Sequence, residues 1–390
     1  MRIKKIIARE ILDSRGLLTL EVEIKTDSAL AIASVPSGTS VGKYEAISIS
    51  TAKATAIVKK IAKNFLAKEL EPEEIDEALM RLDGTKNKSK LGANTTLAIS
   101  VAAHKAAALE NDLELWQYLN KKLKIKPKTP LSLFNFINGG AHGGNELDFQ
   151  EYLLVPRVRA QKLKHYAIES FQKLKSYLEK NLGKQATNYG LEGGFTPNFT
   201  CLHEPLDAIC EALNYAFKNF YLGLDCATSR LFKNGAYFLE KRNWSAGELI
   251  ERYLKLATDY PLIYLEDPFP EDAFEDWAYL NKKLKRILIV GDDLTATNPE
   301  RIELVAKKKC CNAVILKPNQ IGTLSEALRA SKIASKYGLK KIVSHRSGES
   351  DDAWIVDFAI GIGADGLKAG APARERIIKW NRLFRILEKL

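Results

Sequence analysis

Six short apolar segments in the second half of the chain constrain the fold more than any other feature. Each is nearly continuous in apolar residues, ends in an ionisable residue and is followed by a stretch of helical periodicity. The end residues are Asp225, Glu266, Asp292, Lys317, His345 and Lys368, whose positions differ by 41, 26, 25, 28 and 23 residues. Apolar strands that alternate with helices indicate a parallel sheet covered by helices on both faces.

The number and order of these units favour a closed barrel over a doubly wound sheet. Six units follow one another in series, and most intervals suit one strand and one helix. A glycine-rich phosphate fingerprint, which would mark a dinucleotide fold, follows none of these segments. We therefore predict the α/β class, with a TIM-barrel-like βα barrel in the C-terminal part of the chain.

The first third of the chain has a different pattern, of strands and then helices. Short β-branched runs separated by turn residues predict three strands, at Ile3–Ile11, Leu20–Lys25 and Leu30–Val35. From Thr51 to about Asn120 the apolar residues recur three and four apart, which predicts helices. The basic, proline-containing segment Lys121–Pro130 is interpreted as a linker. We expect a small N-terminal α+β domain over residues 1–125 and the barrel over residues 126–390.

Composition excludes several classes of protein. A chain of 390 residues with 46% hydrophobic and 27% charged residues is typical of a folded globular protein. An uncharged apolar run of membrane-spanning length is absent, and Arg9, Glu10 and Asp13 interrupt the N-terminus too early for a signal peptide. The five cysteines are odd in number and lack a C-x-x-C spacing, which argues against disulfides and zinc sites. We therefore expect a cytoplasmic protein with reduced thiols and no membrane association.

The net charge of +11 has two interpretations. It fits a surface that binds nucleic acid or another anion, and it also fits ordinary use of lysine on a solvated surface. Acidic residues are interspersed with the lysines, and a long arginine tract is absent. We favour the second interpretation and do not expect nucleic acid as a partner.

The residues at the segment ends suggest a reaction. Catalytic groups of βα barrels lie at the C-terminal ends of the strands. Asp225, Glu266 and Asp292 would meet there, and an all-oxygen ligand set favours a hard divalent ion such as Mg2+. Lys317 and Lys368 would face this ion, which would lower their pKa values and allow one of them to act as a general base. Such a site suits proton abstraction next to a carboxylate.

Motifs along nearly the whole chain resemble those of the enolase family. They are DSRG (13–16), VPSGTSVGKYEA (35–46), LDGTKNKSKLGAN (82–94), NGGAHGGNELDFQE (138–151), LEGG (191–194), GLDCATS (223–229), YLEDPF (264–269), GDDLTATNP (291–299), LKPNQIGTLSEAL (316–328), SHRSGES (344–350) and KAGAPAR (368–374). The resemblance implies an enolase-type barrel and the reversible dehydration of 2-phosphoglycerate to phosphoenolpyruvate through a metal-stabilised enediolate. It also implies a homodimer, with an octamer as the alternative.

The resemblance assigns a role to each matched residue. Asp225, Glu266 and Asp292 would bind the first Mg2+, and Ser40 would bind a second Mg2+ together with the substrate. Lys317 would remove the C2 proton, and Glu192, with Glu151 beside it, would help the C3 hydroxyl to leave. The substrate-binding residues would be Lys368 for the carboxylate, Arg346 and Ser347 for the phosphate, and Ser40 and Gln150. His345 and His142 would complete the catalytic set.

The sequence also departs from the family pattern, and two alternatives remain open. Leu17 and Leu18 follow DSRG where the family has Asn-Pro, and Leu191 stands where the family has Asp. One alternative is a superfamily lyase acting on another acid substrate; Arg346 and Ser347 argue against it because they imply a phosphate. The other is a weakly active paralogue that serves as a binding protein, for which Leu191 and the +11 charge are the motivation.

Overall fold

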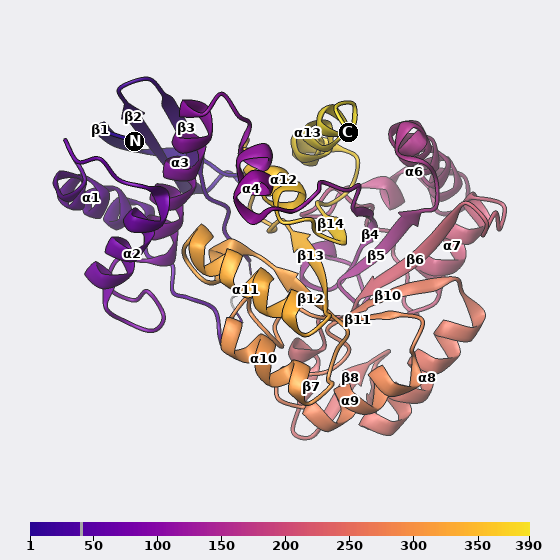
Figure 1. Cartoon of the computed structure of the whole chain (residues 1–390). Helices are drawn as coiled ribbons and strands as arrows, with labels where there is room; N and C mark the ends of the chain where they lie inside the picture. Colours follow the sequence, from indigo (N-terminus) through magenta and orange to yellow (C-terminus); the bar gives the residue numbers. More distant parts are fainter. Residues whose placement is uncertain (40–41) are drawn as a thin grey trace.

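The computed structural model describes all residues except 40 and 41, and it divides into two parts (Figure 1). The N-terminal part opens with an antiparallel meander of β1 (Ile3–Leu12), β2 (Leu18–Thr26) and β3 (Leu30–Ser34). The helices that follow are α1 (Thr51–Ile61), η1 (Ala62–Asn64), α2 (Pro72–Asp83), α3 (Ala93–Glu110) and α4 (Leu115–Leu123). The expected strands and the helical region are confirmed.

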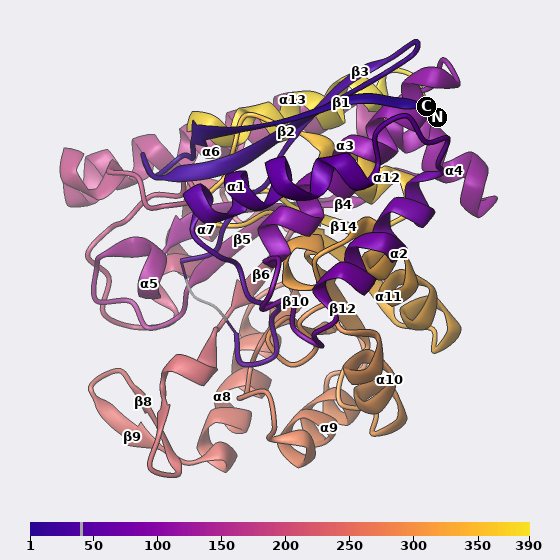
Figure 2. The same ribbon diagram turned by 90° about the vertical axis from the view of Figure 1, so that its left-hand side faces the viewer.

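Helix α3 joins the two parts of the molecule. It packs on β2 and β3 on one side and against the barrel on the other (Figure 2). It is buried around nearly its whole circumference, which its alanine-rich sequence permits because small side chains allow close approach. Leu324 N donates to Ser100 Oγ at 2.9 Å, and the buried Lys88 forms an ion pair with Glu326 at 2.7 Å. These polar contacts fix the N-terminal part on the rim of the barrel.

The predicted linker is shorter than expected. Residues 121–123 form the last turn of α4, and an irregular segment leads on to residue 131. A capping box between Glu114 and Gln117 starts this helix, and Lys121 and Lys122 suit its negative C-terminal end. Lys121 and Lys122, which were interpreted as part of a linker, therefore stabilise the C-terminal end of α4.

Eight strands close the C-terminal barrel (Figure 1). They are β4 (Leu131–Asn138), β5 (Glu151–Pro156), β6 (Phe220–Asp225), β10 (Leu262–Glu266), β11 (Leu288–Gly291), β12 (Ala313–Leu316), β13 (Lys340–Ser344) and β14 (Gly366–Lys368). The helices are α5 (Gly140–Gly143), α6 (Ala160–Leu182), α7 (Glu204–Ala212), α8 (Ala246–Asp259), α9 (Phe274–Lys283), α10 (Pro299–Lys307), α11 (Leu324–Lys336), α12 (Trp354–Gly361) and α13 (Ile377–Leu387). Short 3-10 turns are η2 (Lys184–Thr187), η3 (Thr228–Arg230), η4 (Pro318–Gln320) and η5 (Arg374–Arg376). The barrel fold is confirmed.

One strand runs against the expected direction. Strand β5 is antiparallel to both β4 and β6, whereas the other neighbouring strands of the barrel are parallel. The connection from β4 to β5, residues 139–150, holds only the single turn α5 in a fully described stretch. A parallel return requires a longer crossover, usually with a helix, so the chain turns back directly. The sheet is therefore mixed and not wholly parallel.

An extra three-stranded sheet explains the long interval between Asp225 and Glu266. Strands β7 (Phe232–Lys233), β8 (Ala236–Leu239) and β9 (Arg242–Trp244) form a small antiparallel sheet between β6 and α8. The interior of the barrel is filled separately, by a buried cluster of Leu133, Leu153, Val155, Tyr264, Val290, Ala313, Ile315 and Ile342. This packed interior leaves the strand ends as the place where polar side chains gather.

The barrel core predicts a stability difference between two identical substitutions. Ile315→Ala removes a fully buried side chain and leaves a cavity, and we expect a loss of about 2–5 kcal/mol in the free energy of unfolding. Ile168→Ala on α6, where the side chain is 48% exposed, is the control, with an expected change of at most about 0.5 kcal/mol. Urea unfolding followed by circular dichroism measures both values. Equal losses would contradict this description of the core.

Candidate functional site

One buried cavity at the C-terminal ends of the strands brings the predicted residues together. Its lining includes His142, Gln150, Glu151, Glu192, Asp225, Asp292, Lys317, His345, Arg346, Ser347 and Lys368. Glu266 contacts this set through Lys368, whereas Ser40 lies outside the described residues. Eleven of the predicted residues therefore share one cavity although they come from widely separated parts of the chain.

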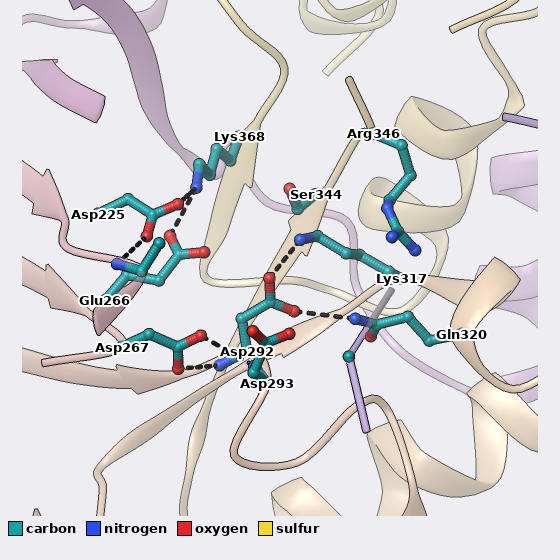
Figure 3. A network of polar contacts seen from close by, with 12 residues as sticks. Asp225, Glu266, Asp267, Asp292, Asp293, Lys317, Gln320, Ser344, Arg346 and Lys368 are labelled. Carbon is teal, nitrogen blue, oxygen red and sulfur yellow. Dashed lines mark hydrogen bonds and ion pairs between the residues drawn. The ribbon is translucent and has the colours of Figure 1, made fainter. Parts of the chain in front are cut away.

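Lys368 holds two of the predicted metal ligands. Strands β6 and β10 are parallel neighbours, and their register places Asp225 opposite Glu266. Lys368 Nζ, from the end of β14, donates to Asp225 Oδ2 at 2.8 Å and to Glu266 Oε2 at 2.7 Å (Figure 3). It also lies 3.1 Å from Glu151 Oε2. Because this ammonium group is buried among carboxylates, their attraction outweighs burial and raises its pKa well above the usual value.

The third predicted ligand, Asp292, is held from the opposite side of the cavity. Lys317 Nζ donates to Asp292 Oδ2, and Gln320 Nε2 donates to Asp292 Oδ1 at 3.1 Å (Figure 3). Burial lowers the pKa of Lys317, but the Asp292 carboxylate outweighs it and leaves that pKa raised. The expectation of a lowered lysine pKa rested on a bound dication, which would offset the charge of these carboxylates, and it stays a prediction.

Asp225, Glu266 and Asp292 fit a divalent cation. Burial and the neighbouring carboxylates of Asp225 and Asp292 raise the pKa of Glu266 to about 8. Its buried Oε1 atom has no hydrogen-bond partner among the described residues. A cation between these acids would offset the repulsion between their charges and would give the Oε1 atom of Glu266 a partner. Carboxylate oxygens are the ligands that Mg2+ prefers.

Two further acids shape the site, and the motif analysis assigned them no role. Asp267, directly after Glu266, accepts hydrogen bonds from the backbone N–H groups of Asp292 and Asp293, both at 2.9 Å. Carboxylate oxygens of these three aspartates lie within 4.8 Å of one another. Burial and Asp292 raise the pKa of Asp293 to about 7. The paired acids Glu266-Asp267 and Asp292-Asp293 were the signal in the sequence that marked them.

Two consecutive hydrogen bonds connect Arg376, His345 and Glu192 at the cavity. Arg376 Nη1 contacts His345 Nδ1 at 3.0 Å, and His345 Nε2 contacts Glu192 Oε2 at 3.1 Å. Because a guanidinium group only donates, Nδ1 accepts and the neutral imidazole carries its proton on Nε2. His345 therefore donates to Glu192. Arg376 was not predicted as a site residue; it is fully buried in η5 and also binds the carbonyl oxygens of Leu191, Arg346 and Ser347.

The pKa values of Glu192 and Glu151 shift in opposite directions because their partners differ. Burial alone raises the pKa of Glu192, but His345, His142 and Arg376 hold that pKa well below its usual value. Burial and the Glu192 carboxylate raise the pKa of Glu151 well above its usual value. His142 Nδ1 lies 3.5 Å from Glu192 Oε1 and 3.7 Å from Glu151 Oε1. The cavity therefore holds one acid with a raised pKa next to one with a lowered pKa.

The predicted phosphate clamp faces the loop that follows β3. The Arg346 guanidinium binds Glu45 Oε2 at 2.9 Å and Glu45 Oε1 at 3.2 Å. Ser347 Oγ accepts from Thr39 N at 2.8 Å. Glu45 was not predicted either, although it lies in the motif at 35–46. At the strand ends, Gln150 Nε2 donates to Asp225 Oδ2 at 3.3 Å.

Known proteins resemble this chain over its whole length. Residues 3–119 match a family model described as "Enolase, N-terminal domain", and residues 126–390 match one described as "Enolase, C-terminal TIM barrel domain". The chain is 40% identical to an enolase of Elusimicrobium minutum over 410 residues, which cover 100% of this chain and 96% of that protein. It is 42% identical to an enolase of Pyrococcus furiosus (99% and 94% covered) and 41% identical to one of Methanosarcina acetivorans (100% and 95%).

The burial of His345 predicts a pH dependence of stability. Burial lowers its pKa to about 4, from an ordinary value of 6.5. Between these values the unfolded chain binds more protons than the folded one, so stability falls as pH decreases from 6.5 to 4, by up to about 3 kcal/mol. Urea unfolding across this range should show a shallower slope in His345→Gln than in the original chain. The same substitution at the exposed His165 is the control; identical slopes for the His345 variant and the original chain would refute the prediction.

Proposed function

The chain belongs to the enolase family, and we propose that it catalyses the reversible Mg2+-dependent dehydration of 2-phosphoglycerate to phosphoenolpyruvate in glycolysis and gluconeogenesis. It is a hydro-lyase of the phosphopyruvate hydratase type. One observation carries the proposal: Asp225, Asp292, Lys317 and Lys368 line one cavity at the strand ends, Glu266 adjoins them through Lys368, and the chain matches enolases from end to end.

Asp225, Glu266 and Asp292 would hold the first Mg2+, and a second would join with the substrate at Ser40. The ion, when bound, supplies positive charge that stabilises the charge developing on the substrate carboxylate. The support for these ligands is the crowding of their carboxylates and the unpartnered Oε1 atom of Glu266. Lys368, which lies among the same acids, would also bind the carboxylate of the substrate.

Lys317 would act as the base that takes the C2 proton. Lys317 lines the cavity from the segment after β12, which stands across the closed barrel from β5, the strand that begins at Glu151. The proton and the hydroxyl would thus leave from opposite sides of the substrate. The pKa of Glu151 is raised and that of Glu192 is lowered, so Glu192, with Glu151 and His142 beside it, would help to deliver a proton to the leaving hydroxyl. His345 would keep Glu192 ionised and in place.

Arg346 and Ser347 would bind the phosphate. A guanidinium fork matches phosphate oxygens in charge and shape. Glu45, which now pairs with Arg346, would have to yield to the phosphate. This buried arginine favours a phosphorylated substrate over the acid substrates of other superfamily lyases. Gln150 would line the substrate beside Asp225.

We also propose the arrangement of the whole protein. Residues 1–125 would form the N-terminal domain and residues 126–390 the catalytic barrel, in agreement with the end of α4 at Leu123. The assembly would be a homodimer, or an octamer built from such dimers, in the cytoplasm. Among the described helices, none is long and apolar enough to cross a membrane. Binding of nucleic acid is not proposed, since the acids and arginine of the cavity suit a small anion with a metal ion.

Replacement of the proposed base tests the reaction. Lys317→Ala should reduce the rate of phosphoenolpyruvate formation from 2-phosphoglycerate about 10²–10⁴-fold, because the group that accepts the C2 proton is lost. Ultraviolet absorbance of the product follows the reaction. Lys340→Ala, at the exposed start of β13, is the control and should retain full activity. Full activity in Lys317→Ala, or none in the original chain with Mg2+ present, would overturn the proposed function.

Replacement of a metal ligand tests the proposed cation site. Asp292→Asn removes one charged oxygen donor, and we expect Mg2+ affinity to fall by at least about tenfold. Titration calorimetry with Mg2+ alone measures this without reliance on turnover. Asp351→Asn, at an exposed position, is the control. Unchanged Mg2+ affinity in Asp292→Asn would remove this residue from the ligand set.

A further inference from the structure

A second group of metal-binding donors lies outside the active-site cavity. Cys201 and His203 stand in the loop before α7, and Glu240 stands in the turn between β8 and β9. One donor atom from each of these residues lies within 4.8 Å of the other two. None of the three is among the described residues that line the active site. The β8–β9 hairpin lies at the edge of the barrel (Figure 2).

Backbone contacts hold these donors in place. Glu240 Oε1 accepts from the N–H of Leu202 at 3.0 Å, which ties the hairpin turn to the loop between Cys201 and His203. The backbone N–H of Glu240 donates to Asp148 Oδ2 at 2.7 Å, and the N–H of Cys201 donates to Glu204 Oε2 at 2.8 Å. The three side chains are half-buried, so a small ion reaches them without unfolding of the loop.

Arg252, from α8, already contacts this group. Its Nη2 lies 3.4 Å from His203 Nδ1 and 3.6 Å from Glu240 Oε1, both long for such contacts. Its buried Nε atom has no hydrogen-bond partner in the described part of the chain. While Arg252 donates to Nδ1, a neutral His203 carries its proton on Nε2 and has no free nitrogen for a metal. Arg252 would therefore compete with any cation for His203.

We propose that Cys201, His203 and Glu240 form a binding site for a thiophilic divalent cation of the Zn2+ type. A thiolate, an imidazole and a carboxylate are the donors that zinc takes in proteins, and water would fill the fourth position. On binding, the Cys201 thiol releases its proton to solvent and its sulfur bonds to the metal, without change of oxidation state. Binding would join the α7 loop to the hairpin. The spacing analysis found no zinc motif because Glu240 comes from a distant hairpin.

Co2+ is the probe for this site, because a cobalt–thiolate bond gives a charge-transfer band in the near ultraviolet that oxygen ligands do not give. Titration with Co2+ in the presence of excess Mg2+, which occupies the all-oxygen active site, should produce this band at one equivalent, and Zn2+ should abolish it. The other four cysteines are buried, which leaves Cys201 as the accessible thiol. The band should be lost in Cys201→Ser.

The remaining variants separate the metal site from a simple polar network. His203→Gln and Glu240→Gln should weaken Co2+ binding, His165→Gln should not, and Arg252→Met should strengthen it because the competing donor is gone. Hydratase activity of each variant reports that it is folded, since none of these residues lines the catalytic cavity. Absence of the band in the original chain, or its persistence in Cys201→Ser, would overturn the proposal. Co2+ affinity equal to that of the original chain in both His203→Gln and Glu240→Gln would also overturn it.

Discussion

Repulsion between buried carboxylates at the mouth of the barrel is the constraint on which the rest of the structure depends. Asp225, Glu266 and Asp292 come from neighbouring strands, and the closeness of the other two acids helps to raise the pKa of Glu266. Lys368 balances the first two and Lys317 balances the third. Most of the polar architecture around the mouth serves to keep these charges in place, because an unpaired buried charge costs several kcal/mol.

Paired charges also connect the two parts of the chain at the site. The loop after β3 reaches the mouth of the barrel, where Glu45 pairs with Arg346 and Thr39 binds Ser347. Helix α3 makes this possible, since it fixes the N-terminal sheet on the rim through close packing of small residues. The barrel provides the acids and lysines, and the N-terminal part covers the side that carries Arg346 and Ser347. A phosphate that enters would replace Glu45 as the partner of the arginine.

Prediction from the sequence succeeded where one strand end carries one functional group. Each of the six apolar segments is a strand, and its ionisable residue ends the strand or directly follows it. The place of these residues in a barrel therefore follows from the local sequence pattern. It failed where the environment of a group decides its state. The ion pairs of Lys317 with Asp292 and of Lys368 with Asp225 were not predicted, and the antiparallel course of β5 follows from a connection that lacks a crossover helix. Arg376 and Glu45 carried no periodic signal, because their importance comes from contacts with residues far away in the chain.

The chain's own pattern thus determined its class, its barrel, its family and the set of residues that can meet at the active site. These depend on periodicity and motif spacing, which are local properties of the sequence. Only the tertiary structure decided which partner each charge has, that the pKa values of Glu151 and Glu192 shift in opposite directions, that Nε2 of His345 faces Glu192, and that Glu240 lies beside Cys201 and His203. Such features depend on distances of a few ångströms between distant segments, because electrostatic and hydrogen-bond energies change steeply over that range.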